Sequence, residues 1–123
     1  MSKILIVDDS PTEVHVFKTW LEKHDFDVIT AESGEQGLDK AKAETPDAII
    51  MDVVMPGMSG FQATRQLSKD PATSAIPVVI VTTKDQETDR IWGMRQGAVD
   101  YLTKPVTEDQ LVAKLKEAMS RAA

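Results

Sequence analysis

The sequence predicts an α/β fold, a doubly wound five-stranded parallel sheet, from two patterns along the chain. Short apolar runs alternate with longer stretches of helical period, as in consecutive βα units. Each apolar run also ends in a polar or Pro/Gly segment. The expected strands lie near 3–8, 27–31, 47–52, 77–82 and 99–102, and the expected helices near 11–24, 34–44, 60–69, 85–96 and 108–121.

Helix-start signals agree with this order. The segment Ser10–Glu13 is interpreted as a capping box, with Pro11 at the first helical position. The same spacing of Ser or Thr before Gln begins the second and fifth helices, at Ser33–Gln36 and Thr107–Gln110. We therefore expect the box, with both of its reciprocal hydrogen bonds, at all three places.

Length and composition indicate one globular domain over residues 1–123. A chain of 123 residues buries roughly two thirds of its unfolded surface without cross-links. It has no cysteine, which excludes disulfides and thiolate chemistry. Fourteen Lys and Arg against twenty Asp and Glu give a net charge of −6, which argues against nucleic-acid binding.

Targeting signals are not apparent in the sequence. Met1–Lys3 leads directly into the first expected strand, so a signal peptide is not expected. No apolar run approaches the length of a membrane span, and membrane association is not expected either. The expected location is the cytoplasm.

Polar side chains follow four of the expected strands. Asp8 and Asp9 follow the first strand, Asp52 ends the third, Thr82 ends the fourth, and Lys104 follows the fifth. The carboxyl ends of parallel strands meet at one edge of the sheet, where ligands of such folds bind. One of the carboxylates could simply cap a helix, but capping does not explain all three. The sequence therefore predicts an acidic site at this edge.

Such a site needs a counterion. Two carboxylates about 5 Å apart repel each other by roughly 3 kcal/mol at an effective dielectric constant of about 20. Lys104 offsets part of this repulsion, and a hard divalent cation offsets the rest. Mg²⁺ suits oxygen ligands and keeps waters for phosphate oxygens, with Mn²⁺ as an acceptable substitute. Asp9→Ala or Asp52→Asn is accordingly expected to stabilise the metal-free fold.

The same residues suit phosphoryl transfer. Asp52 can act as a nucleophile and carry an aspartyl phosphate. Lys104 supplies a point charge, and the Thr82 hydroxyl can donate to a phosphoryl oxygen. Catalysis would then consist of positioning and charge neutralisation.

At these residues the chain resembles the response-regulator receiver family of two-component signalling. The resemblance covers essentially the whole length, and four elements in order carry it: Asp8-Asp9, Met51-Asp52 with Met55–Gly60, Thr82, and Lys104-Pro105. It implies the flavodoxin-like receiver fold, with sheet order 2-1-3-4-5. It also implies a protein that catalyses its own phosphorylation and slow dephosphorylation, not an enzyme acting on a separate substrate.

The resemblance assigns roles to the acidic residues. Asp52 would accept phosphoryl from a phosphohistidine on a sensor histidine kinase. Asp9 and Asp52 would bind Mg²⁺, Asp8 would act mostly through water, and the backbone carbonyl of Val54 would complete the protein ligands.

Further roles follow from the same resemblance. Lys104 would contact the phosphoryl group, and the Lys104–Pro105 peptide bond would be cis. Thr82 would be the switch hydroxyl and Tyr101 the aromatic side chain that moves with it. Val54 and Lys84 occupy positions that tune the lifetime of the phosphate. Lys84 either pairs with the phosphoryl group or is a solvated surface lysine.

The expected output is a protein contact. No output domain is expected, and the chain looks like the stand-alone, chemotaxis-type members, closest in segments 60–67 and 81–88 to regulators of twitching motility driven by type IV pili. The expected partners are a chemotaxis-type sensor kinase and a downstream protein target. The expected oligomeric state is a monomer or a weak phosphorylation-linked dimer.

The fourth helix, fifth strand and fifth helix would form the partner surface. The candidate contact residues on this surface are Arg90, Trp92, Arg95 and Tyr101. Trp and Arg are enriched at binding hot spots. Trp92 has an alternative interpretation as a partly buried packing residue. Gly93 lowers helix propensity by up to about 1 kcal/mol relative to Ala, which suits a mobile element.

Three other functions are alternatives to a phosphorylation switch. A Mg²⁺-dependent phosphatase would commonly have a second acid two residues after the nucleophile, where this chain has Val54. A flavodoxin-like electron carrier would not place Asp8 and Asp9 beside a flavin phosphate. A phosphate sink, or a phosphorylation-independent interaction module of the same fold, is the most serious rival.

Overall fold

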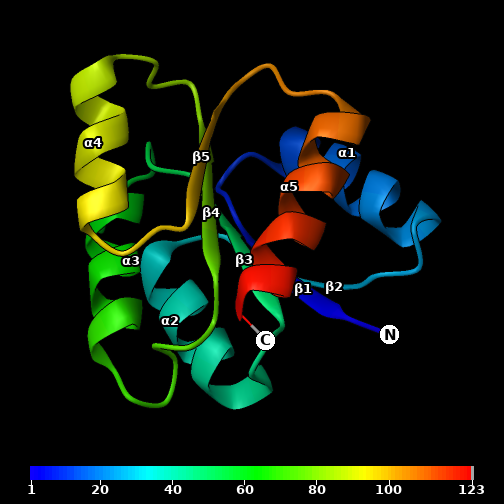
Figure 1. Ribbon diagram of the computed structural model, residues 1–123, viewed down its shortest axis with the longest axis horizontal. Coiled ribbons are helices and arrows are strands. Elements are labelled where there is room, and N and C mark those ends of the chain that lie inside the picture. The colour runs from blue at the N-terminus through cyan, green and yellow to red at the C-terminus, as the bar shows by residue number, and fades with distance from the viewer. Residues whose placement is uncertain (123) are drawn as a thin grey trace.

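A five-stranded parallel sheet forms the centre of the computed structural model, which describes residues 1–122 (Figure 1). The strands are β1 (Lys3–Val7), β2 (Asp27–Ala31), β3 (Ala48–Met51), β4 (Val78–Thr82) and β5 (Asp100–Thr103). The helices are α1 (Pro11–Lys23), α2 (Gly34–Glu44), α3 (Gly60–Lys69), α4 (Glu87–Arg95) and α5 (Glu108–Ala122). The strand order is β2-β1-β3-β4-β5, which confirms the predicted fold class and sheet order.

The helices cover both faces of the sheet. Helices α1 and α5 lie on one face, and α2, α3 and α4 lie on the other (Figure 1). Successive side chains of a strand point to opposite faces, so each central strand supplies both cores. In β1, Ile4 and Ile6 pack with Leu21 of α1 and Leu115 of α5. Leu5 joins the second core, toward α2 and α3.

The predicted capping boxes turn out differently at the three helices. At Thr107–Gln110 both reciprocal hydrogen bonds form. At Ser33–Gln36 only the serine bond forms, because the Gln36 side chain accepts from the backbone N–H of Glu32. At Ser10–Glu13 the serine accepts from the backbone N–H of Glu13 at 3.4 Å. The Glu13 carboxylate, however, bonds to Lys104 instead of closing the box.

Among residues 1–122, no helix combines the length and the apolar character that are needed to cross a membrane.

Candidate functional site

Lys104 lies at the centre of three carboxylates at the carboxyl edge of the sheet. Its Nζ is 3.0 Å from Asp8 Oδ2 and 3.5 Å from Asp52 Oδ2, and it also contacts Glu13 Oε2. The side chains of Lys104, Asp8 and Asp52 are buried, and that of Glu13 is partly exposed. We call Asp8, Glu13 and Asp52 the acidic cluster.

Strand pairing brings these residues together. Val7 is the register partner of Met51, so the residues that follow β1 and β3 leave the sheet side by side. The ladder extends one step further, because the backbone N–H of Asp52 donates to the Val7 carbonyl at 2.9 Å. Similarly, the backbone N–H of Lys104 donates to the Thr82 carbonyl at 2.7 Å. The β-sheet itself therefore positions the site.

The two buried carboxylates are oriented by backbone donors. The N–H of Ser10 donates to Asp8 Oδ1 at 2.9 Å, and the N–H of Val53 donates to Asp52 Oδ1 at 2.8 Å. In each carboxylate the other oxygen, Oδ2, is the one that faces Lys104. These bonds hold both carboxylates in a fixed orientation, with Oδ2 toward Lys104.

Burial raises the pKa of both Asp8 and Asp52 above the ordinary value for an aspartate. The negative charge of Asp8 raises the pKa of Asp52 further, whereas Lys104, the Thr82 hydroxyl and the N–H of Val53 lower it. For Lys104, burial lowers the pKa, but the bonds to Glu13 and Asp8 more than offset burial and raise it overall. The site is thus short of positive charge.

Asp52→Asn should raise the free energy of unfolding of the metal-free protein near pH 7 by about 0.5–2 kcal/mol, the usual gain when functional strain is relieved. The raised pKa means that ionised Asp52 costs stability once the pH exceeds its ordinary value of 3.8, because the unfolded chain loses the proton first. The gain should therefore disappear in acid. Urea unfolding in chelator at several pH values measures this gain, and a variant no more stable than the wild type near neutral pH would contradict the prediction.

Asp9→Ala should give a smaller gain in the free energy of unfolding, because Asp9 is exposed.

The acidic cluster offers oxygen ligands for a cation. One carboxylate oxygen each from Asp8, Glu13 and Asp52 lies within 4.8 Å of the other two. Carboxylate oxygens are the ligands that Mg²⁺ prefers, so this acidic edge of the sheet fits the ion. The predicted ligand Asp9 is exposed and lies outside the cluster, and Val54 is also exposed.

Glu13 is the site residue that the sequence interpretation missed. It was assigned to a capping box, which would have turned its carboxylate back to the helix. Its position in the first turn after Asp8 and Asp9 was the available signal, because that turn starts at the same sheet edge. The Glu13 carboxylate points to the ammonium group of Lys104, which follows the distant strand β5.

The predicted switch residues Thr82 and Tyr101 are connected through the backbone of one residue, Lys84. The Thr82 hydroxyl accepts from the backbone N–H of Lys84 at 3.4 Å, and the Tyr101 hydroxyl donates to the Lys84 carbonyl at 2.8 Å. Both switch side chains are buried, and burial raises the pKa of Tyr101 to about 12. The Lys84 ammonium group instead lies 3.8 Å from Asp89 of α4.

Gly60 packs directly on the backbone that carries Asp52. A Cβ at this position would lie 1.9 Å from the Asp52 carbonyl oxygen and 2.8 Å from Val53 Cα. The Gly60 N–H also donates to the Val53 carbonyl at 3.0 Å. The start of α3 thereby holds the chain just after Asp52 in place.

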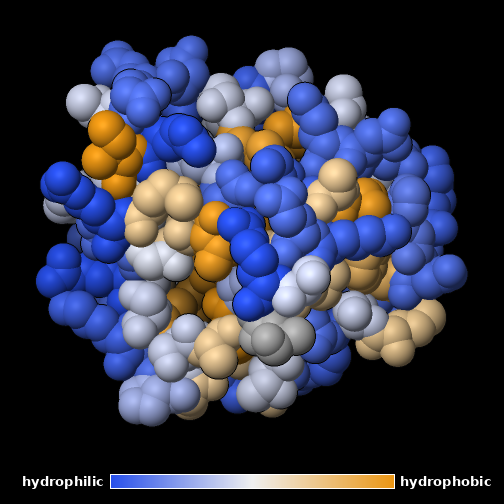
Figure 2. All heavy atoms as spheres, in the orientation of Figure 1, coloured by the Kyte–Doolittle hydropathy of each residue, from blue (hydrophilic) through white to orange (hydrophobic). Residues whose placement is uncertain are grey.

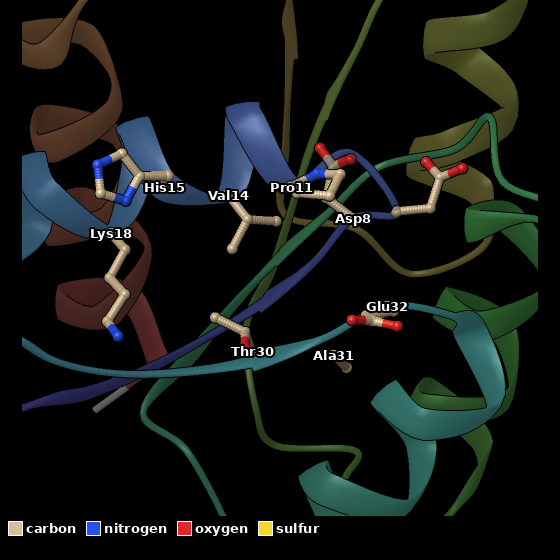
Figure 3. A pocket seen from close by; sticks show the side chains of 9 residues that line it. Asp8, Pro11, Val14, His15, Lys18, Thr30, Ala31 and Glu32 are labelled. Atoms are coloured by element: carbon tan, nitrogen blue, oxygen red, sulfur yellow. The ribbon is translucent and has the colours of Figure 1, made fainter.

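A groove of about 250 Å³ opens beside Asp8, between α1 and β2 (Figure 3). Pro11, Val14 and Lys18 line it from α1, and Thr30 lines it from β2. It gives solvent a path to the acidic edge. The Lys104–Pro105 peptide bond is cis.

The predicted partner surface is largely exposed. Trp92 is 49% exposed, and its neighbours Ile91 and Met94 are 44% and 37% exposed. Arg90 and Arg95 are exposed on the same helix, whereas Tyr101 is buried. Figure 2 shows apolar atoms over α4, on a side of the molecule that is otherwise mostly hydrophilic.

Comparison with known proteins agrees with this geometry. The response regulator receiver domain family matches residues 4–116. The chain is 59% identical over 120 residues to Protein PilH of Pseudomonas aeruginosa, covering 98% of this chain and 99% of PilH. A putative response regulator from Chloroflexus aurantiacus superposes with a TM-score of 0.93 at 32% identity, covering 98% of each chain.

A further solved structure bears on the acidic cluster. It is the receiver domain of the sensor histidine kinase PA1611 from Pseudomonas aeruginosa, with a magnesium ion coordinated in its active-site cleft. Its TM-score is 0.89 at 28% identity, covering 97% of this chain and 98% of that chain. Family match, fold and acidic edge agree: the chain belongs to the response regulator receiver family.

Proposed function

We propose that the chain is a phosphorylation-dependent switch of a two-component system, acting in the cytoplasm. Asp52 accepts a phosphoryl group from a phosphohistidine of a sensor histidine kinase. The observation that carries this proposal is the buried Asp52 at the carboxyl edge, with Lys104 3.5 Å from its free oxygen. The family match and the identity to PilH support it.

The transfer needs no proton acceptor. A carboxylate oxygen of Asp52 attacks phosphorus, and the bond from phosphorus to the imidazole nitrogen of the donor breaks. The bonding pair stays on that imidazole, and Asp52 becomes an acyl phosphate. Lys104 stabilises the charge on the phosphoryl oxygens, and the Thr82 hydroxyl donates to one of them.

The acidic residues have a second task, which is to hold a divalent cation. Asp52 and Asp9 would bind Mg²⁺, together with the Val54 carbonyl, and Asp8 would bind it through water. When bound, Mg²⁺ neutralises charge on the carboxylate and phosphoryl oxygens. The magnesium ion reported in the active-site cleft of the PA1611 receiver domain supports a magnesium site at this edge.

Phosphorylation would reach α4 through the backbone N–H and carbonyl groups of Lys84. The phosphoryl group adds about −1.5 to −2 charges, which draws the Thr82 hydroxyl toward it. Thr82 would then release the N–H of Lys84, whose carbonyl holds Tyr101. The exposed side chains of Arg90, Trp92 and Arg95 would change their presentation to a protein target.

Similarity to PilH and to chemotaxis-type receivers suggests the pathway. We propose a chemotaxis-type kinase as donor and control of twitching motility by type IV pili as the output. In this role the phosphorylated and unphosphorylated forms must differ in affinity for a target, whereas a phosphate sink requires no such difference.

Phosphotransfer from a purified, radiolabelled chemotaxis-type kinase tests the proposal. Label should leave the kinase and appear on the wild-type chain within the mixing time of the experiment, and Asp52→Asn should take up none. Equal labelling of Asp52→Asn would refute the assigned acceptor. Pull-down of a target protein by the phosphorylated and the unphosphorylated chain then separates a signalling role from a phosphate sink, because only a signalling role requires a difference in affinity.

A further inference from the structure

All three N–H donors of Lys104 have a carboxylate acceptor within reach. They face Asp8 Oδ2, Glu13 Oε2 and Asp52 Oδ2, and an ammonium group has three donors in total. A phosphoryl oxygen can therefore bond to Lys104 only if one of these carboxylates gives up its place. This conclusion rests on the proposed role of Lys104 in phosphoryl transfer.

Burial indicates which carboxylate leaves. The side chain of Asp8 is 3% exposed and that of Asp52 is 9% exposed, whereas that of Glu13 is 39% exposed. Asp8 and Asp52 are also held by the backbone donors of Ser10 and Val53. The Glu13 carboxylate has no protein donor other than Lys104 among the described hydrogen bonds of residues 1–122. It can rotate into water, where its charge is solvated.

We infer that Glu13 is a positioning residue that occupies Lys104 in the unphosphorylated protein and competes with the incoming phosphoryl group for it. In this state Lys104 is kept at the site and its charge is neutralised. During transfer from acetyl phosphate, Asp52 oxygen bonds to phosphorus and acetate leaves with the bonding pair, while Lys104 exchanges Glu13 for a phosphoryl oxygen. Glu13 thereby slows phosphorylation and weakens the hold of Lys104 on the phosphoryl group.

Two substitutions separate competition by contact from a general charge effect. Glu13→Gln removes the charge, and Glu13→Asp keeps the charge but shortens the side chain by one methylene, which breaks the contact with Lys104. Glu32→Gln is the matched control, because Glu32 is an exposed acid at the groove beside Asp8 and has no hydrogen bond with Lys104. Circular dichroism establishes that all three variants fold.

Both Glu13 variants should be phosphorylated by acetyl phosphate about two- to fivefold faster than the wild type, the range expected for loss of a half-exposed ion pair. Both should also bind beryllofluoride, a phosphoryl mimic, more tightly by a similar factor at saturating Mg²⁺. The Mg²⁺ concentration needed for half-maximal labelling should stay the same. Glu32→Gln should match the wild type in all three measurements.

Several results would overturn this inference. Slower labelling with a higher Mg²⁺ requirement in Glu13→Gln would make Glu13 a metal ligand. A gain in Glu13→Gln with none in Glu13→Asp, or an equal gain in Glu32→Gln, would make the effect one of charge alone. Wild-type rates in both Glu13 variants would leave the proposed function intact and refute only the competition. If the wild-type chain itself forms no adduct with acetyl phosphate or with a kinase, the proposed function fails instead.

Discussion

Lys104→Met is expected to lower the free energy of unfolding of the metal-free protein by about 2–3 kcal/mol, which is at or just below the lower end of the range for breaking a fully buried ion pair. Methionine keeps most of the apolar stem, so the loss reports mainly the charge. Without the ammonium group, Asp8, Glu13 and Asp52 repel one another at the sheet edge. Urea unfolding in chelator near pH 7 measures the effect.

Acid should relieve this loss, because protonated carboxyls no longer repel one another. Lys114→Met is the matched control: Lys114 lies 3.1 Å from Asp100, and its side chain is 35% exposed. Removing such a surface pair typically costs about 1 kcal/mol or less. Equal losses for the two lysines would show that the acidic cluster is not crowded.

Gly60→Ala is expected to destabilise the protein by about 2–3 kcal/mol, the upper part of the range for overpacking. The new methyl group would meet the backbone carbonyl of Asp52 at 1.9 Å, so the start of α3 must move. That movement would also displace Asp52, and phosphorylation should slow along with the loss of stability.

Gly34→Ala provides the comparison. The atoms nearest to its Cβ would belong to the side chain of Met58, at 3.1 Å, and a flexible methionine can yield. Thermal unfolding of the two variants should therefore differ clearly, with Gly34→Ala close to the wild type. Similar melting temperatures for Gly60→Ala and the wild type would contradict the close packing of α3 on Asp52.

The regular elements were predictable because each is specified locally. The central strands are continuous apolar runs, as strands buried on both faces must be, and serine or threonine caps begin four of the helices, at Ser10, Ser33, Ser59 and Thr107. The largest shift is at α4, which was expected from 85 and begins at Glu87. There Gln86 replaces the usual serine or threonine cap, so the signal in the sequence was weaker.

Contacts between distant segments were harder to predict. The sequence placed Asp8, Asp52 and Lys104 at one edge because strand order follows from the fold class. It could not show that the side chain of Glu13, instead of capping its own helix, contacts Lys104. That choice depends on a side chain 91 residues away.

Gly93 shows the same limit. From the sequence alone its low helix propensity suggested a mobile helix. In the structure it is buried, and a Cβ there would lie 2.9 Å from Ile80 Cδ1 and 3.1 Å from Tyr101 Cδ2. Close approach of α4 to β4 and β5 therefore accounts for this glycine. No local pattern in the helix indicates which strand it will touch.

Intact mass after incubation with acetyl phosphate, with and without Mg²⁺, tests the central claim most directly. The wild-type chain should gain the mass of one phosphoryl group only when Mg²⁺ is present, and Asp52→Asn should gain none under either condition. An adduct that forms in chelator, or one that persists in folded Asp52→Asn, would contradict a Mg²⁺-dependent phospho-acceptor at Asp52.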